Sequence, residues 1–336
     1  FMASLMRGTR LVALDPFEWV VRPRILLDAI ERYRTTFCWL PNFAFSHIVR
    51  SVPASGEWDL GSIRAFINCS EPCKAVSFDR FAISFAPCGV TVEKLQICYA
   101  LAENVFAATQ TTLDRPVRRV ALDAEAFENG VVKAARERAR FMEVLSCGRP
   151  VDGVEIRIAD ERGHDQRRDR IGEVALRSPF LFEGYYRQPE VTRERLRDGW
   201  YFTGDMGFVE GGELFVTGRK DDMIVLNGRN YYAHEIETVV NGVAGVLPGR
   251  CVAIGVDDWA IGAAVLVVIA EFEPGADRQS VSRAIRAAVL DWFGVAAHAV
   301  VPASPGKLVK TTSGKLSRTM NKSLFVAGAF DTMKAV

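Results

Sequence analysis

The sequence has almost no excess of either charge: 42 Lys and Arg stand against 41 Asp and Glu in 336 residues. A net charge of +1 produces no long-range field that would attract nucleic acid, and no basic run or basic-aromatic alternation suggests local binding. The longest apolar run, residues 260–270, contains a glycine and is about half the roughly 20 residues that a membrane span needs. We therefore expect neither a nucleic-acid partner nor a membrane span.

Paired cysteines are also missing. The seven cysteines are scattered along the chain and include no CxxC pair. An odd, unpaired set argues against a disulfide framework and against a structural zinc site, so a reducing cytoplasm is the expected location. No signal peptide is evident, although the chain begins at Phe1, inside a fold, so that a leader can precede it.

The chain is long enough for about two domains, each with its own core. Thr9 to Asp15 predicts a short strand, and Arg22-Pro23 predicts the start of a helix with one apolar face, formed by Leu26, Leu27, Ile30 and Tyr33. Together they predict a βα unit. The expected fold class is α/β, with a mixed sheet and helices in a large domain.

Two further predicted strands end in loops that carry candidate binding residues. Ser62 to Asn68 leads into Cys69-Ser70-Glu71-Pro72, and Leu95 to Tyr99 leads into a loop that ends at Glu103. Open α/β sheets place their ligands at the carboxyl ends of such strands. Tyr99 is suited to stack on a purine, and Glu103 to hold Mg²⁺ beside its phosphates, although both residue types are common in loops.

The stretch from Asp198 to Val240 contains the densest group of candidates. Thr203-Gly204-Asp205 places a carboxylate on a tight glycine turn, where it can accept hydrogen bonds from both hydroxyls of a ribose. Arg219 can present donors to the same ribose or to its phosphate. Lys220-Asp221-Asp222 then separates two apolar strands and predicts a solvated joint between domains. A charged hairpin turn is the alternative interpretation.

The second half of the chain changes pattern. Short alternating strands between Gly148 and Pro179 predict a small β-barrel subdomain. Before them, Arg118 to Phe127 predicts a strand and Val131 to Met142 a basic helix, which can also be a solvated surface excursion.

Beyond Asp221 the pattern predicts a small α+β domain. Its expected elements are a helix at His234–Val240, strands at Cys251–Val256 and Ala264–Phe272, and a helix at Ser280–Phe293 that Gly294 caps. The expected buried face of the last helix consists of Val281, Ile285, Ala288, Val289 and Trp292.

Near the end, residues 310–315 read KTTSGK and predict a flexible basic loop. It is not a phosphate-binding P-loop, because seven residues separate Gly306 from Gly314 and Lys315 is followed by Leu316. From composition alone, Lys315 is a surface lysine.

Taken together, these motifs resemble those of the acyl-adenylate-forming superfamily, and most closely those of the fatty acyl-AMP ligases. The matching stretches are PNF at Pro41–Phe43, SEP at Ser70–Pro72, YALAE at Tyr99–Glu103, TGD at Thr203–Asp205, GRKDD at Gly218–Asp222 and KTTSGKLSR at Lys310–Arg318. The resemblance covers essentially the whole chain. Ala100 stands where the family usually has glycine.

The resemblance implies a role for each matching residue. For the nucleotide, it implies Tyr99 as the adenine-stacking residue, Asp205 as the ribose ligand, Arg219 as a second nucleotide ligand, and Ser70, Glu71, Pro72 and Ala102 as neighbours of the base. For the chemistry, it implies Glu103 as the Mg²⁺ ligand, Lys315 as the residue that reaches the acyl carboxylate and the α-phosphate, and Asp221 as the pivot of a domain rotation. Pro41, Asn42 and Phe43 would line the acyl tunnel, although a core strand followed by a turn is the alternative there.

The implied domain division is a large domain at 1–220 and a mobile C-terminal domain at 221–336. Within the large domain, the resemblance implies a family-type insertion at 104–144 and the β-barrel subdomain at 148–218. In the family the insertion braces the mobile domain and disfavours release of the acyl group to coenzyme A.

One family feature is missing from this sequence. The Ser/Thr/Gly-rich loop that cradles the β- and γ-phosphates of ATP lies upstream of all these motifs in the family, and no such loop occurs here. We expect the chain to be a fragment of a longer ligase, with a truncated protein or a second chain that supplies the missing part as alternatives.

The expected function is ATP-dependent activation of a fatty acid to an acyl-adenylate, with transfer to the phosphopantetheine thiol of an acyl carrier protein in lipid, polyketide or nonribosomal peptide synthesis. An acyl-CoA ligase of the same fold is the nearest alternative. A catalytically inactive module that binds AMP or acyl-adenylate is an alternative of a different class.

Overall fold

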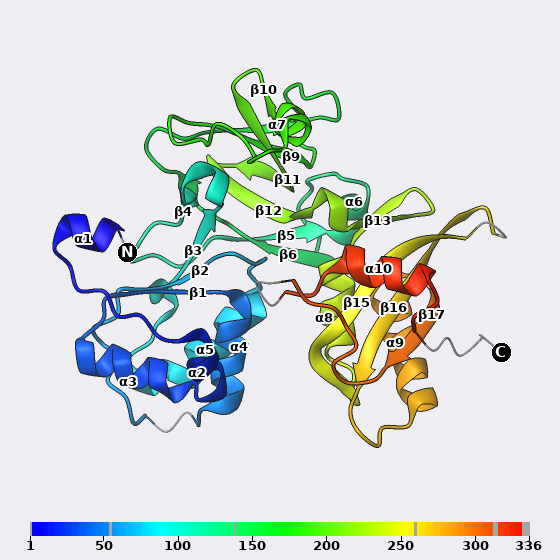
Figure 1. Cartoon of the computed structure of the whole chain (residues 1–336), viewed down its shortest axis with the longest axis horizontal. Helices are drawn as coiled ribbons and strands as arrows, with labels where there is room; N and C mark the ends of the chain where they lie inside the picture. The colour runs from blue at the N-terminus through cyan, green and yellow to red at the C-terminus, as the bar shows by residue number, and fades with distance from the viewer. Residues whose placement is uncertain (1, 54–55, 138, 259–260, 312–314, 331–336) are drawn as a thin grey trace. The chain divides into compact units, whose positions relative to one another are not determined.

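The computed structural model describes residues 2–53, 56–137, 139–258, 261–311 and 315–330 (Figure 1). The chain divides into two compact units: unit 1 comprises residues 1–124 and 132–217, and unit 2 comprises residues 125–131 and 218–336. Of the helices within the described residues, none combines the length and the apolar character that a bilayer crossing requires.

Unit 1 contains two five-stranded sheets and the two-stranded sheet β5-β6, with the helices that pack on them. Its helices are α1 (Met2–Arg7), α2 (Pro16–Val21), α3 (Arg24–Tyr33), α4 (Asn42–Ser51), α5 (Ala75–Phe85), α7 (Pro189–Arg195) and the short turns η1 (Ala86–Cys88), η2 (Val92–Lys94) and η3 (Ala102–Asn104). Its strands are β1 (Phe37–Leu40), β2 (Ala65–Asn68), β3 (Leu95–Ala100), β4 (Ala107–Gln110), β5 (Arg119–Asp123), β6 (Phe141–Leu145), β7 (Arg149–Pro150), β8 (Glu155–Ala159), β9 (Gly172–Arg177), β10 (Leu196–Arg197), β11 (Trp200–Glu210) and β12 (Glu213–Arg219), whose last residues continue into unit 2.

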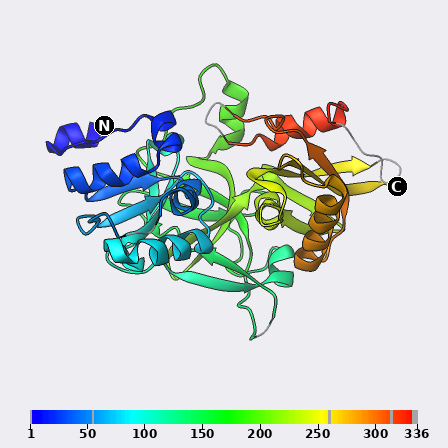
Figure 2. The ribbon, with the colours of Figure 1, turned by 90° about the horizontal axis from the view of Figure 1, so that it is seen from below.

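The first sheet has the order β1-β2-β3-β4-β7, with β1, β2 and β3 parallel. Helices α3, α4 and α5 cover one face of it (Figures 1 and 2). Phe45, Phe66 and Phe81 meet there at ring-centroid distances of 5.1 and 5.2 Å, and all are fully buried. This aromatic core fixes the strands whose carboxyl ends carry the candidate binding loops.

The second sheet is antiparallel and corresponds to the predicted subdomain of short strands. Strands β10, β11, β9 and β8 lie side by side in that order, and β12 pairs with β11. Strand β9 is buried over almost its whole length, and Phe208 and Phe215 stack at a centroid distance of 4.9 Å. These strands hold the Thr203-Gly204-Asp205 segment.

Unit 2 is a small α+β layer structure. Its elements are α6 (Ala124–Glu128), which is continuous with unit 1 at its first residue, η4 (Lys220–Asp222), β13 (Met223–Leu226), β14 (Arg229–Tyr232), α8 (Ala233–Val240), β15 (Val246–Asp258), β16 (Ala263–Phe272), α9 (Arg278–Phe293), β17 (Ala297–Ala303) and α10 (Arg318–Val326). Helices α8 and α9 pack on one face of the β15-β16-β17 sheet, and α10 packs on the other (Figure 1).

Most predicted elements of unit 2 are present. Asp277 caps the N-terminus of α9 through two backbone N–H groups, and Gly294 ends the helix at φ 64°, as predicted. The predicted buried face is partly wrong: Val281, Ile285 and Val289 are buried, but Trp292 is 56% exposed and Phe293 takes its place in the core.

Three predictions for unit 1 are wrong. Thr9–Asp15 forms no strand, because the Asp15 carboxylate instead accepts from the N–H groups of Phe17 and Glu18 and starts α2. The βα unit is therefore absent. Pro23 lies at the N-cap of α3, one position before the predicted helical start, and Tyr33 at the helix end is exposed.

The predicted basic helix at 131–142 is also absent. Its backbone instead pairs with β5: the Asp123 N–H donates to the Lys133 carbonyl at 2.8 Å and the Ala135 N–H to the Ala121 carbonyl at 2.9 Å. These bonds satisfy the backbone outside a helix, so the tertiary context overrides the helical propensity of the basic residues.

The core of unit 2 supplies a stability test. Ile285 on α9 is fully buried between helix and sheet, whereas Leu290 on the same helix is 51% exposed. Ile285→Ala should lower the free energy of unfolding by about 2–5 kcal/mol, because it removes buried methyl groups and leaves a cavity. Leu290→Ala, the matched control, should change it by about 0.5 kcal/mol or less. Equal denaturant midpoints for the two variants would contradict this packing.

Candidate active site

Two of the predicted nucleotide ligands lie in direct contact. The Tyr99 hydroxyl, at the end of β3, donates to Asp205 Oδ2 on β11 at 2.5 Å. The two residues are 106 positions apart in the sequence, and each belongs to a different sheet of unit 1. Asp205 is partly exposed, so the hydrogen bond orients its carboxylate while leaving it accessible to a ligand.

The local backbone explains how Asp205 is presented. The register of β11 against β9 shifts between Phe202 and Met206, so Thr203-Gly204-Asp205 forms an irregular step in the strand. Gly204 takes φ 76°, which suits glycine. Thr203 Oγ1 donates to the Val174 carbonyl at 2.8 Å and accepts from the Asp205 N–H at 3.0 Å. Such irregularities redirect a side chain out of a strand.

The raised pKa of Tyr99 is consistent with its hydrogen bond to Asp205. Burial raises the pKa of Tyr99 well above its usual value, and the neighbouring Asp205 carboxylate raises it further. The phenol therefore stays protonated at neutral pH and remains a donor to the carboxylate.

The third predicted residue, Glu103, is held by a pair of tyrosines. The Tyr185 hydroxyl donates to Glu103 Oε1 at 2.8 Å and lies 3.0 Å from the Tyr201 hydroxyl. Phe182 packs edge-on against both tyrosine rings, and its N–H donates to the Glu103 carbonyl at 2.8 Å. The segment after β9 thus fixes both the backbone and the side chain of Glu103.

Both candidate loops contain strained backbone. Ser70 in the loop after β2 has φ 71°, and Val105 in the loop after β3 has φ 62°. Residues other than glycine rarely adopt such values, and a β-branched residue least of all, at a cost of about 1–3 kcal/mol each. Strain of this kind persists where surrounding contacts impose it, which is typical of binding loops.

The predicted adenine loop and the predicted tunnel wall are tied together. Glu71 Oε2 accepts from the Phe43 N–H at 3.0 Å, at the first turn of α4. Asn42 Oδ1 accepts from Asn68 Nδ2 at 3.0 Å and from the Lys74 N–H at 3.2 Å. The side chains of Glu71 and Asn42 therefore hold the loop after β2 against the start of α4. Phe43 is 45% exposed, and Ser70, Pro72 and Ala102 are exposed beside them.

The remaining predicted residues belong to unit 2. Arg219 ends β12, Asp221 lies in the η4 turn that follows, and Lys315 lies between β17 and α10; all three are exposed. Thr312 to Gly314 of the predicted flexible loop lie outside the described residues. Its flanks are ordered, because the Thr311 N–H donates to the Lys315 carbonyl at 2.7 Å.

Among the described residues, no three His, Cys, Asp or Glu side chains converge as a metal site would require. Mg²⁺ keeps several waters and is usually held through one or two carboxylates together with the phosphates of a nucleotide. The single carboxylate of Glu103, oriented by Tyr185, fits that pattern.

The thiols close to this region are not nucleophiles. Burial raises the pKa of Cys98 to about 12 and that of Cys147 to about 11, and raises the pKa of Cys73 well above its usual value. The protein gives these thiols no cationic partner strong enough to reverse that shift, so they stay protonated.

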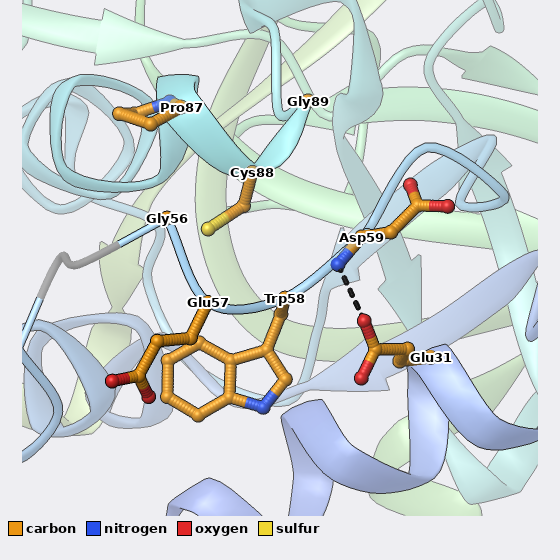
Figure 3. A pocket seen from close by; sticks show the side chains of 8 residues that line it. All are labelled: Glu31, Gly56, Glu57, Trp58, Asp59, Pro87, Cys88 and Gly89. Carbon is orange, nitrogen blue, oxygen red and sulfur yellow. Dashed lines mark hydrogen bonds between the residues drawn. The ribbon is translucent and has the colours of Figure 1, made fainter.

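A pocket of about 480 Å³ elsewhere in unit 1 contains none of the predicted site residues (Figure 3). Trp58 and Cys88 line it together with Glu31, whose carboxylate accepts from the Asp59 N–H at 2.8 Å. Two of its carboxylates are engaged by arginines, since Asp59 accepts from Arg34 at 2.6 Å and Glu57 lies 3.9 Å from Arg24, so it lacks the convergent polar groups of a ligand site.

Sequence reasoning missed Tyr185 and Tyr201 as members of this region. The only local signal for Tyr185 was the aromatic-rich stretch PFLFEGYY, which by itself indicates packing. Their proximity to Glu103 follows from the pairing of distant segments, which a sequence motif does not encode.

Comparison with known proteins identifies the family of the chain. Residues 1–186 match the family described as AMP-binding enzyme. The chain is 31% identical to the medium-chain-fatty-acid–[acyl-carrier-protein] ligase JamA of Moorena producens, over 98% of this chain and 59% of that protein. It is 29% identical to the putative fatty-acid–CoA ligase fadD25 of Mycobacterium tuberculosis, over 98% of this chain and 60% of that protein.

Among solved structures, one from a study of fatty acyl-adenylate ligases of E. coli and L. pneumophila superposes with a TM-score of 0.86 and 25% identity, over 93% of this chain and 57% of that one. The chain therefore spans about 60% of the length of the curated relatives it matches. The predicted resemblance is confirmed at the level of fold and family. With half of its residues matched by the family model and its strand-end loops arranged as described, the chain belongs to the AMP-binding enzyme family.

Proposed function

We propose that this chain supplies the adenine, ribose and acyl sites and the mobile domain of a fatty acyl-AMP ligase that delivers its product to an acyl carrier protein. The observation that carries the proposal is the Tyr99–Asp205 hydrogen bond beside the oriented Glu103 carboxylate. It gathers an aromatic ring and two carboxylates around the end of β3 and the irregular step in β11, which suits a nucleotide with its metal.

In the first half-reaction, a carboxylate oxygen of the fatty acid attacks the α-phosphorus of ATP, and the bond to the β-phosphate breaks in line. Pyrophosphate leaves, and the acyl-adenylate remains. Mg²⁺ bound at Glu103 would neutralise charge on the phosphate oxygens, and the Lys315 ammonium would do so at the reacting carboxylate and α-phosphate. Asp205 and Tyr99 hold the nucleoside, so that positioning supplies much of the acceleration.

In the second half-reaction, unit 2 turns about Asp221 and carries Lys315 away from the adenylate. The phosphopantetheine sulfur attacks the acyl carbonyl carbon, the carbon–oxygen bond to AMP breaks, and AMP leaves with the thiol proton passing to solvent. Exposure of Asp221 in the η4 turn suits a residue whose backbone angles change.

The contacts of the predicted insertion support the proposal that the acyl acceptor is a carrier protein and not coenzyme A. Its residues 125–131 group with unit 2. Within that unit, Phe127 packs on Tyr232 at a centroid distance of 5.6 Å, and buried Glu128 pairs with Arg229 at 3.3 Å. Both partners lie on β14, in the hairpin that directly follows the hinge. These contacts would restrain the mobile domain, as the resemblance implies.

Three measurements separate this proposal from its alternatives, and they are made, like the other activity assays below, on a complete ligase that contains this chain. Calorimetric binding of an acyl-sulfamoyl adenosine, which mimics the acyl-adenylate, should be detected together with fatty-acid-dependent pyrophosphate exchange. Binding without exchange would favour an inactive adenylate-binding module. Transfer to coenzyme A at a rate equal to or above transfer to a carrier protein would favour the acyl-CoA ligase.

Replacing Asp205 should weaken nucleotide binding. Asp205→Asn loses charge-assisted hydrogen bonds to ribose worth about 1.5–3 kcal/mol each, so affinity for the acyl-adenylate analogue should fall about 10- to 100-fold by calorimetry. Tyr99→Phe should cause a smaller loss, because it frees the carboxylate but keeps the ring. Asp152→Asn, at an exposed position in the same unit, serves as the control. Unchanged affinity in Asp205→Asn would remove this residue from the site.

Removing the Tyr185 hydroxyl should alter the response to magnesium. Tyr185→Phe keeps the packing with Phe182 but removes the donor to Glu103, so the Mg²⁺ concentration for half-maximal acyl-adenylate formation should rise about 3- to 10-fold. Tyr186→Phe changes the adjacent tyrosine, which is 81% exposed, and should have no effect. A lower maximal rate at unchanged Mg²⁺ dependence would show that Tyr185 does not act through the metal ligand.

Weakening the insertion contact should change the acceptor preference. Glu128→Ala removes a buried partner of Arg229 and should raise acyl transfer from synthetic acyl-adenylate to coenzyme A several-fold relative to transfer to a carrier protein. Glu125 also pairs with Arg229, at 3.7 Å, but its side chain is 74% exposed, so Glu125→Ala should change little. The same ratio in both variants would mean that the insertion does not restrain the mobile domain.

A further inference from the structure

A buried amide in unit 2 joins the two sides of the segment that carries Lys315. Asn321, on α10, is fully buried. Its Oδ1 accepts from the Val309 N–H at 3.0 Å, and its Nδ2 donates to the carbonyls of Val309 at 3.0 Å and Ser317 at 2.8 Å. Because Asn321 makes three hydrogen bonds to the backbone of Val309 and Ser317, it fixes the distance between these two residues.

The described residues next to these two positions, 309–311 and 315–317, pair with each other, and we call this pair of segments the Lys315 hairpin. Lys310 and Leu316 form an antiparallel bridge, and the Ser317 N–H donates to the Val309 carbonyl at 3.0 Å. The Thr311 N–H donates to the Lys315 carbonyl itself. The backbone of Lys315 is therefore held by hydrogen bonds that end on Asn321.

A second anchor follows directly. Arg318 begins α10, and its guanidinium makes two bonds to Glu237 on α8, at 2.8 and 2.6 Å, and one to Asp222 at 2.6 Å. The three side chains are only 13–24% exposed. Glu237 also accepts from the Ala253 N–H on β15 at 3.1 Å. A planar guanidinium bound on two sides has little freedom, so this contact fixes the start of α10.

Asp222 is the residue directly after the proposed pivot, Asp221. Arg318 thus connects the first turn beyond the pivot to the helix start that lies three residues after Lys315. The contact joins parts of unit 2 that are 96 positions apart in the sequence.

We propose that Asn321 and Arg318 are positioning residues, which make the Lys315 hairpin, the start of α10 and the turn after the hinge one rigid arm. The inference rests on the proposed function in one respect, the role of Lys315 in acyl-adenylate formation. A rotation at Asp221 would then deliver the backbone of Lys315, from which its side chain reaches the reacting groups, to one place, because these contacts hold the arm between pivot and lysine. Misplacement of a charged group by about 1 Å can cost on the order of 10²-fold in rate.

The test uses Asn321→Asp, which keeps the size of the side chain and removes both of its donors, and Arg318→Lys, which keeps the charge and loses the two-sided contact. Lys322→Met, on the exposed side of the same helix, is the control. Amide hydrogen exchange should become at least about 10-fold faster at Thr311 and Ser317 in Asn321→Asp and remain unchanged in the β15-β16 core. If amide exchange in the β15-β16 core is also faster in Asn321→Asp, the test passes to Arg318→Lys, in which exchange should be faster at Thr311 and Ser317 and unchanged in that core.

Rates of the two half-reactions provide a readout that a general loss of stability would not produce. Both variants should form acyl-adenylate about 10-fold or more slowly and transfer the acyl group from preformed acyl-adenylate within about twofold of the unaltered chain. Unchanged hairpin exchange, or equal slowing of both half-reactions, would overturn the positioning role. Faster hairpin exchange in a chain whose Lys315→Ala variant forms acyl-adenylate normally would instead contradict the proposed function while leaving the rigid arm intact.

Discussion

The contact on which the candidate site depends is the hydrogen bond from Tyr99 to Asp205. It joins the end of β3, in the mixed sheet, to an irregular step in the antiparallel sheet. The first sheet packs on its helices, and the apolar cluster of the antiparallel sheet also includes Ala108 of β4. The meeting of Tyr99 and Asp205 therefore requires these two sheets to pack correctly, and a small shift between them would separate a ring and a carboxylate that, in the proposed function, act on one nucleotide.

The orientation of Glu103 depends on the packing of the same two sheets. Its carboxylate is oriented by Tyr185 and its backbone by Phe182, both of which come from the segment that leaves the antiparallel sheet. The strained angles of Ser70 and Val105 occur in the loops that these contacts surround. Rigid sheets thus support loops whose conformations would be unfavourable alone, and the free energy of packing offsets the cost of presenting the site.

Unit 2 meets a different requirement of the proposed function. In that proposal Lys315 moves into and out of the active site by rotation at Asp221, which requires a stiff connection between the two residues. The structure supplies the connection with polar contacts of low exposure, centred on Arg318 and Asn321, where an apolar core would have held the same segments with less directional constraint. Hydrogen bonds fix relative orientation because their strength depends on angle as well as distance.

The errors of prediction in this chain share a cause. Thr9–Asp15 has the apolar character of a strand but no neighbouring strand to pair with among the described residues, and Asp15 uses its carboxylate to cap a helix instead. Residues 131–142 have helix-favouring composition, yet their backbone pairs with β5. Trp292 has the right spacing for the core, but Phe293 occupies the space. In each case a contact outside the apolar or helix-favouring pattern decided between two locally acceptable states.

The sequence by itself determined the family, the α/β class, most strands and helices of unit 2, and the candidate residues Tyr99, Glu103, Asp205, Arg219, Asp221 and Lys315, because short motifs and apolar periodicity are properties of neighbouring residues. Only the tertiary structure decided which of these residues meet, that Tyr185 orients Glu103, that Glu71 caps α4, and that Arg318 and Asn321 hold the Lys315 hairpin. Such contacts join positions up to 106 residues apart, and no local pattern records them, since each depends on how separately formed sheets and helices pack.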